Sequence, residues 1–233
     1  MADYYQGDTI SRERDMVGFG TRAQFLTRTY LHLFGAIVGF TLIEVALFQG
    51  GHAQRMAEAM LGVNWLFVLG GFVLVSWFAS RAAHTADTLG KQYAALVAFV
   101  VAQAIIFVPL LYVANHYAPG AIRSAAIVTL TGFSGLTFVA WSTRKDFSFL
   151  GGMLRWGGIV ALLAIVGGVV FGFQLGTWFS VAMVGMAGAA ILYDTSNVLL
   201  RFPEDRYVAA ALELFASVAL MFWYVLRLFM SRD

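Results

Sequence analysis

The segment TWFSVAMVGMAGAAILYDTSNVLL (residues 177–200) decides the fold of this chain. A membrane-spanning helix needs about 20 predominantly apolar residues, and this segment meets that length. The short turn RFPEDR (residues 201–206) follows it, and YVAAALELFASVALMFWYVLRLF (residues 207–229) is a second apolar run. Pro203 cannot continue the first helix. We therefore predict that the two runs form an antiparallel pair of membrane helices.

The composition of the whole chain agrees with this prediction. The chain has 233 residues, of which 60% are hydrophobic and 12% charged, and its mean hydropathy is +0.77. A soluble domain has about 25% charged residues, so much of this apolar surface must face lipid. Runs too long for barrel strands and without alternation must be helices. The predicted spans are residues 28–48, 62–80, 92–114, 122–142, 150–172, 176–200 and 207–229.

These runs predict an all-α, polytopic membrane protein with seven transmembrane helices. Residues 25–233 would form one transmembrane domain, and residues 1–24 a mobile, polar N-terminal arm. Cysteine is absent, which excludes disulfides, thiolate metal sites and thiol nucleophiles. The net charge is only +2 and no dense basic run occurs, so we expect no nucleic-acid partner. The lipid bilayer is the first partner that the sequence indicates.

Lysine and arginine predict the orientation of the chain in the membrane, because they concentrate on the cytoplasmic side. A cytoplasmic N-terminus places all but four of the 15 Lys and Arg residues on that side. The four exceptions are Arg55, Arg123, Arg227 and Arg232. We therefore predict a cytoplasmic N-terminus and an external C-terminus.

A carboxylate inside the first run raises the question of function. Asp194 near the middle of a membrane helix would cost roughly 2.5–3.5 kcal/mol. It lies seven residues before Arg201, and Glu213 lies seven residues after Arg206. Both acids are then roughly 10 Å from the turn, at similar depth. Ser217 is one helical turn deeper than Glu213, on the same face.

Two acids in a medium of low dielectric constant can share a proton, or can hold a hard cation through their oxygen atoms. Asp194, Glu213 and Ser217 thus predict a pH-sensitive cation site. An alternative stays open. Asp194 would only hydrogen-bond to a neighbouring helix, and Glu213 would extend towards the membrane interface.

A second pair of charges lies on the other side of the predicted bundle. Glu44 is near the outer end of the first span and Arg227 is near the outer end of the last. Their depths match, so a salt bridge between them could join two helices as a latch. The alternative is two independent charges at the interface.

Several stretches together resemble the Bax inhibitor-1, or transmembrane Bax inhibitor motif, family. They are YDTSNVLLRF (residues 193–202), the run at residues 207–229, FLTRTYLHL (residues 25–33) and GFSGLTFVAWSTRKDFSFLGGML (residues 132–154). The resemblance covers nearly the whole chain beyond the N-terminal arm. It implies a seven-helix fold with the last helix in the centre, and a pH-dependent calcium leak sensed by two aspartates on the last two helices.

The resemblance carries over to this chain only in part. Asp194 matches the first aspartate, and the resemblance therefore implies Asp194 as a calcium ligand. The second aspartate falls on Ser217. Either Glu213 supplies the missing carboxylate, or the site has one acid and a different pH response. Arg227 matches an arginine of the family's last helix, and Glu44 resembles its acidic partner. Bacterial relatives lie in the inner membrane, and some modulate membrane proteolysis.

Enzymatic readings find less support in the sequence. GFSG (residues 132–135) matches the nucleophile pattern of rhomboid proteases, which needs a histidine base on a later helix. The last histidine is His116, before the motif. An aspartyl protease of the presenilin type would use Tyr193 and Asp194 but needs a second membrane aspartate, and the predicted spans contain none.

We therefore expect a protein that is not an enzyme, binds no resident cofactor and lies in the inner membrane of a bacterium. Two functions remain open. The first is a cation leak channel, with calcium as the transported ion, gated by protonation near Asp194. The second is a non-conducting regulator that binds a membrane protease or another membrane complex.

Overall fold

Long apolar runs form helices because lipid offers no hydrogen bonds to a bare backbone. The computed structural model describes residues 2–231, with side chains from residue 21 onward. Its helices are α1 (Ala2–Gln49), α2 (His52–Leu61), α3 (Trp65–Thr85), α4 (Leu89–Tyr117), α5 (Ala121–Thr143), α6 (Leu150–Phe171), α7 (Thr177–Leu200) and α8 (Tyr207–Met230). All except α2 contain a stretch that is long and apolar enough to cross a membrane. The predicted all-α fold with seven membrane spans is confirmed.

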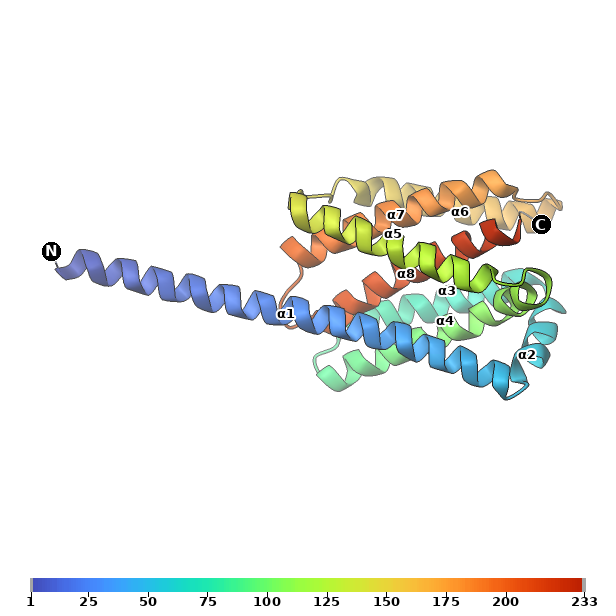
Figure 1. Ribbon diagram of the computed structural model, residues 1–233, viewed down its shortest axis with the longest axis horizontal. Helices are drawn as coiled ribbons and strands as arrows, with labels where there is room; N and C mark the ends of the chain where they lie inside the picture. The colour runs from blue at the N-terminus through green and yellow to red at the C-terminus, as the bar shows by residue number, and fades with distance from the viewer. Residues whose placement is uncertain (1, 232–233) are drawn as a thin grey trace.

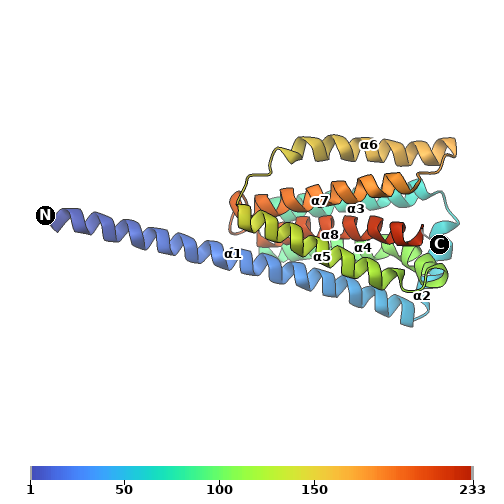
Figure 2. The same ribbon diagram turned by 45° about the horizontal axis from the view of Figure 1, so that its top comes forward.

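Helix α8 lies at the centre of the bundle (Figure 2). Fifteen of its 24 residues are buried, and it contacts α1, α3, α4, α5 and α7. Its small residues Ala209, Ala210 and Ala211 are fully buried, which lets neighbouring helices approach closely. The central position of the last helix is thereby confirmed. Five of the six other spans therefore pack against α8.

Helix α6 lies at the opposite extreme, on the outside of the bundle (Figure 2). Ala161 is the one buried residue of α6, and the helix packs mainly on α7. Large apolar side chains such as Trp156 and Leu163 are exposed along it. In a membrane these side chains face lipid, so α6 adds little to the core.

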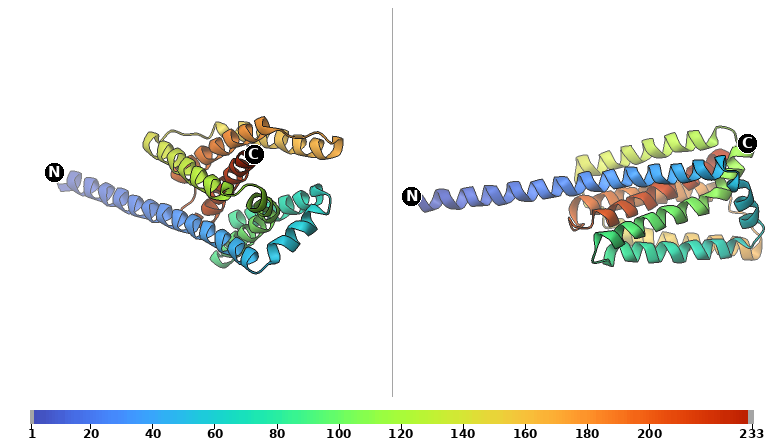
Figure 3. Two further views of the ribbon diagram at one scale, coloured as in Figure 1. Left: turned by 45° about the vertical axis from the view of Figure 1, so that its right-hand side comes forward. Right: turned by 90° about the horizontal axis from the view of Figure 1, so that it is seen from below.

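The structure adds two features that the sequence analysis did not predict. The proposed polar arm is the N-terminal part of α1, whose residues 2–20 extend beyond the bundle as helix (Figures 1 and 3). The connection between the first two spans contains α2, which buries Ala53 and Ala57 and exposes Gln54 and Glu58. With 10 residues, this amphipathic helix is too short to cross a membrane.

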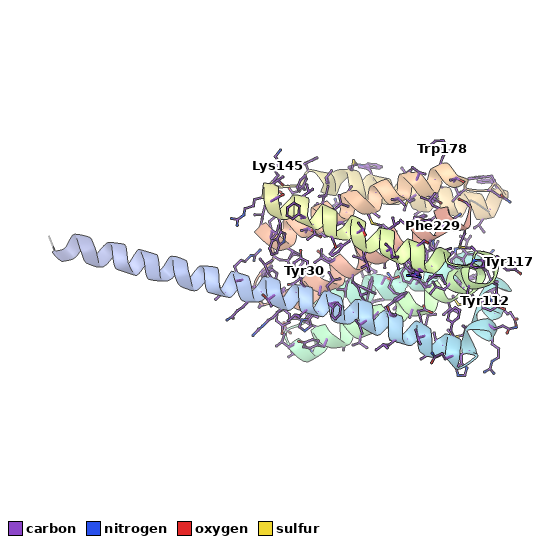
Figure 4. All side chains as sticks on the ribbon, in the orientation of Figure 1. Tyr30, Tyr112, Tyr117, Lys145, Trp178 and Phe229 are labelled. Atoms are coloured by element: carbon purple, nitrogen blue, oxygen red, sulfur yellow. The ribbon has the colours of Figure 1, made fainter. Side chains whose placement is uncertain are left out.

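Polar contacts fasten the end of the bundle at which α1 enters, called here the N-terminal end. Arg22 donates to the carbonyl oxygens of Val198 and Phe202, at 2.6 Å each. The connection between α5 and α6 is held by Arg201, which donates to Asp146. Figure 4 shows Lys145 at this end and Trp178 at the opposite, C-terminal end. The last turn of α7 is thus tied to two other parts of the chain.

Candidate functional site

The predicted helix pair forms and brings Asp194 and Ser217 together. Helix α7 ends at Leu200 and α8 begins at Tyr207, so the two helices run antiparallel. The hydroxyl of Ser217 donates to Oδ2 of Asp194 at 2.5 Å. Ser217 is buried and Asp194 is partly buried. A hydrogen bond to a charged group stabilises by about 1.5–3 kcal/mol, which offsets part of the cost of burying the acid.

Glu213 has a different partner from the one that the sequence suggested. Its Oε1 lies 2.8 Å from Nε2 of His84, near the end of α3. Glu213 lies one turn before Ser217 on α8, close enough to Asp194 for their charges to interact. The two acids are therefore neighbours, but each has its own hydrogen-bond partner.

Hydrogen-bond geometry indicates that the His84–Glu213 pair holds a proton. Nδ1 of His84 lies 2.8 Å from the carbonyl oxygen of Ser80, which can only accept, so Nδ1 must donate. Nε2 faces a carboxylate, and two acceptors cannot share a contact without a proton between them. That proton makes either an imidazolium with a carboxylate or a neutral imidazole with a carboxylic acid. Arg206 is the further charge that acts on His84.

A large cavity lies on the same side of α8. Its volume is about 1000 Å³, and α3, α4, α6 and α8 supply most of its walls. On α8 its lining extends from Leu212 to Arg227, and on α3 from Trp65 to Ser80. Each of these stretches covers about 22 Å along the helix, against a hydrocarbon core of about 30 Å. The cavity thus extends through most of the membrane depth.

The polar groups of this cavity are few and spread along its length. Glu213 and Ser217 lie towards its N-terminal end, Gln103 also lines the wall, and Arg227 lies at the C-terminal end. Ser217 joins this wall to Asp194, which lies directly behind it. A proton or cation in the cavity could therefore act on Asp194 through one hydroxyl group.

These donors do not make a resident calcium site. Calcium takes six to eight oxygen ligands, whereas Asp194, Ser217 and Glu213 supply few, and Glu213 is engaged by His84. In the residues with described side chains, no group of three or more acidic, histidine or cysteine side chains is arranged to hold a metal.

The predicted ion pair between Glu44 and Arg227 is not formed. Glu44 is buried, and neither of its carboxylate oxygens has a hydrogen-bond partner. It lines a second cavity, on the side of α8 that carries Phe222, whereas Arg227 lines the large cavity. Phe222 and Arg227 are five residues apart, which is roughly 140° around a helix. Glu44 and Arg227 therefore line cavities on different faces of α8, which keeps the two charges apart.

Sequence reasoning missed His84 as a member of the site. The second span was predicted to end at residue 80, whereas α3 continues to Thr85. The last turn of α3 is held beside the start of α8 by Arg206, which donates to the carbonyl oxygen of Ala86 at 2.7 Å. A longer span with a histidine in its last turn was the available signal. The partner of that histidine could not be read from one sequence.

Comparison with known proteins identifies related chains. The model of a family described as "Inhibitor of apoptosis-promoting Bax1" matches residues 22–233. Human Bax inhibitor 1 is 25% identical over 201 residues, which cover 83% of each chain.

Two bacterial relatives match over shorter segments. An uncharacterized protein of Pseudomonas aeruginosa is 35% identical over 111 residues, which are 46% of this chain and 49% of that protein. The modulator of FtsH protease YccA of Escherichia coli K12 is 36% identical over 95 residues, which are 40% of this chain and 43% of that protein. The chain therefore spans about half the length of these two relatives.

Proposed function

Because the chain belongs to the Bax inhibitor-1 family, we propose that this integral membrane protein is a pH-sensitive cation leak controlled by Asp194. One observation carries the proposal. Asp194 is bonded to Ser217, which lines a cavity of about 1000 Å³ that covers most of the membrane depth. A titratable acid directly behind the wall of such a cavity can change the charge that a passing cation meets.

The chemistry follows from the two protonation states of Asp194. The ionised carboxylate accepts the Ser217 hydroxyl and places a negative charge near the cavity, which favours a cation there. The protonated acid carries no charge, and its hydrogen bond to Ser217 weakens because charge-assisted bonds are the stronger ones. Protonation therefore changes the affinity of the cavity for cations. It also weakens the hydrogen bond that joins α7 to α8.

The His84–Glu213 pair supplies a second titratable element of the proposed mechanism. A proton gained or lost by the pair changes the charge felt by Asp194, one helical turn away. The charge of Glu213 acts directly on Asp194, and His84 and Arg206 act on that pair in turn. Calcium is the proposed cargo, in the hydrated form that the sparse donor set favours.

The proposed setting is a bacterial inner membrane with the N-terminus in the cytoplasm. Lysine and arginine gather at the N-terminal end of the bundle, where Arg22, Lys145 and Arg201 lie. A relative from another Escherichia coli strain is named an inner membrane protein. The site near Asp194 would then respond to the cytoplasmic pH.

A liposome experiment tests the leak. The purified protein is reconstituted into liposomes loaded with a calcium dye, and the initial flux is measured across a pH series. Wild-type protein should give a flux that depends on pH, and Asp194→Asn should give a flat profile. Asp146→Asn is the matched control, because Asp146 is exposed in the connection before α6. No flux above that of empty liposomes, or an unchanged profile in Asp194→Asn, would refute the proposal.

A second candidate function is a non-conducting regulator of a membrane protease. The observation in its favour is the relative named as a modulator of FtsH protease. In this case the liposomes show no protein-dependent flux. Degradation of a membrane substrate by purified FtsH, measured with and without this protein in the same bilayer, should then change in rate. Unchanged degradation would rule out this candidate for FtsH.

A further inference from the structure

Helix α1 carries a buried acid that is not paired. Glu44 is 6% exposed, and both of its carboxylate oxygens are buried without a hydrogen-bond partner. An isolated buried carboxylate costs several kcal/mol unless a proton or a cation neutralises it. Among the described side chains, no Lys, Arg or His lines the cavity of Glu44, and Arg227 lines the cavity on the other face of α8. Glu44 is therefore an unsatisfied acceptor that a ligand could complete.

A cavity lies directly in front of this acid. Its volume is about 340 Å³, within the range of about 300–1000 Å³ that is typical of small-molecule sites. Its walls come from α1, α4, α5 and α8. Helices α1 and α5 both pack on α8 but hardly touch each other, so the cavity lies between them. The exposed lining residues Val45 and Leu130 mark the side that opens towards lipid.

Aromatic rings surround the acid. Five phenylalanines line the cavity: Phe40, Phe48, Phe107, Phe215 and Phe222. The face of an aromatic ring attracts a cation, and rings that enclose a site are the usual way to bind an organic ammonium ion. Thr129 adds a buried hydroxyl without a partner at the same cavity. Thr41 and Asn115 also line the cavity, but the Thr41 hydroxyl donates to the carbonyl oxygen of Ile37. The acid, the free hydroxyl of Thr129 and the phenylalanine rings therefore define the chemistry of the ligand.

Other classes of ligand fit this cavity less well. A calcium ion would need several oxygen ligands, and Glu44 is the sole ionisable residue in the lining. A fatty acid would place a second negative charge beside Glu44. A phospholipid with an amine headgroup would bury a phosphate that no lining residue can neutralise. A monocationic amine with an apolar body matches the anion, the rings and the opening towards lipid.

We propose that the cavity between α1 and α5 binds a lipophilic organic ammonium ion, with Glu44 as its anionic partner. The ammonium group lies against Glu44 and Thr129, and the apolar body lies among the phenylalanine rings. This site is separate from the Asp194 cavity, on another face of α8. It does not depend on whether the protein conducts ions.

Calorimetry on the full-length protein in nanodiscs tests the proposal. The probes are 4-phenylbutylamine, which is a cation at neutral pH, and 4-phenylbutanol, its uncharged analogue of similar size. Empty nanodiscs give the heat of partition into lipid, which is subtracted. We expect the amine to bind the wild-type protein about tenfold or more tightly than the alcohol. Equal affinities, or no binding of the amine, would overturn the proposal.

Two variants locate the binding. Glu44→Gln keeps the shape of the side chain and should weaken amine binding by about tenfold, while alcohol binding changes by less than about twofold. Glu58→Gln is the matched control, because Glu58 is exposed on α2 and outside the cavity. Ala126→Phe, which fills the cavity from α5, should weaken the binding of both probes.

Amine binding that is unchanged in Glu44→Gln would remove the acid from the site and overturn the proposal. If Glu44→Gln fails to fold, its helix content and its elution in size-exclusion chromatography will show it. In that case Ala126→Phe is the deciding variant, and unchanged amine binding in Ala126→Phe would place the ligand outside this cavity and overturn the proposal. A third arm uses nanodiscs with phosphatidylethanolamine, whose headgroup also carries an ammonium ion. If this lipid competes with the amine, the cavity accepts a phospholipid headgroup and the proposed phosphate-free ligand is wrong.

Discussion

The acids on two sides of α8 differ in their hydrogen bonding. On one face, Ser217 donates to Asp194 and His84 is paired with Glu213. On the face that carries Phe215 and Phe222, Glu44 comes close to α8 with no partner at all. Both faces have a cavity, but the larger one contains several polar groups and the smaller one is almost wholly apolar.

The difference indicates two kinds of use for a membrane acid. An acid whose hydrogen bonds are made within the protein responds to protons, because a proton breaks or changes those bonds. An acid without such bonds is an unpaired hydrogen-bond acceptor, and a ligand from outside the protein can pair with it. Intramembrane acids are functional candidates by default, and the partner of each one indicates which function to test.

The largest effect is expected at Phe107, which separates the two faces. Its buried ring lines both cavities and packs at 4.9 Å from the Trp223 ring and 5.2 Å from the Phe40 ring. Phe107→Ala should destabilise the fold by about 3 kcal/mol, the usual cost of removing a buried phenylalanine ring. Reversible unfolding in mixed micelles measures this value.

The same variant should also join the two cavities. An amine bound beside Glu44 would then change the pH profile of flux, which it should not do in the wild-type protein. Phe138→Ala is the control, because Phe138 is 71% exposed on α5. Equal stability of the two variants would contradict the role of Phe107 as the wall between the cavities.

Ser217→Ala should have the second-largest effect. It removes the donor to Asp194 while adding almost no empty volume, and the expected loss is about 2 kcal/mol in the stability of the ionised state. Because a donated hydrogen bond favours the ionised acid, the pH midpoint of flux should rise. The measurements are unfolding in micelles at neutral pH and the liposome flux series.

Ser76→Ala provides a matched comparison for Ser217→Ala. Ser76 lines the same cavity, but its hydroxyl has no hydrogen-bond partner. Loss of an unpaired hydroxyl should leave stability and the flux profile nearly unchanged. If both serine variants behaved alike, the bond to Asp194 would have no particular role.

The sequence predicted the parts of the site that follow from local periodicity. The hairpin at Pro203 fixed the relative depth of Asp194, Glu213 and Ser217, because consecutive antiparallel helices share one turn. It could not show which neighbour each acid faces, since the rotation of α8 is set by five surrounding helices. The predicted pairing of Glu44 with Arg227 was wrong for the same reason, because it rested on the depth of the two residues and not on the rotation of α8 about its axis.

Two other features were beyond the sequence for related reasons. His84 meets Glu213 only because α3, far away in the chain, packs beside α8. The helix α2 lacks the long apolar run on which span prediction depends, although its own periodicity is amphipathic. To identify contacts between non-consecutive helices, one needs either coordinates or an alignment of homologues that reveals which residue pairs are in contact.

A smaller effect is expected from the His84–Glu213 pair. The side chains are 35% and 29% exposed, so solvent screens the interaction, and His84→Gln should cost less than about 1 kcal/mol. The pH profile of flux should nevertheless narrow, because one of two titrating elements is lost. Glu213→Gln removes the same pair together with the negative charge that acts on Asp194, so its pH midpoint of flux should lie below that of His84→Gln.

His116→Gln is the matched control for His84. Nδ1 of His116 contacts the carbonyl oxygen of Tyr112 at 3.0 Å, the same i−4 arrangement that His84 makes with Ser80. His116 has no ion pair among the described side chains. A pH profile that changes equally in both histidine variants would argue against a specific role for the pair with Glu213.

The smallest effect is expected at Asp146, an exposed acid that contrasts with both buried ones. The backbone and side chain of Ser148 and the guanidinium of Arg201 hold the pKa of Asp146 below its ordinary value of 3.8. A lowered pKa means that this carboxylate contributes stability fully above that ordinary value, and that the contribution is lost as the pH falls through the lower, folded value. Asp146→Asn should therefore be slightly less stable than the wild-type protein at neutral pH, and the difference should vanish in strong acid.

Flux gives the sharper measurement for Asp146. The acid stays ionised throughout the range of about pH 5 to 8, so Asp146→Asn should leave the pH profile of flux unchanged. If the profile changed, the connection before α6 would be coupled to the cavity through Arg201 and the end of α7. The exposed acid would then belong to the gate, and pH sensing could no longer be assigned to the buried face of α8 alone.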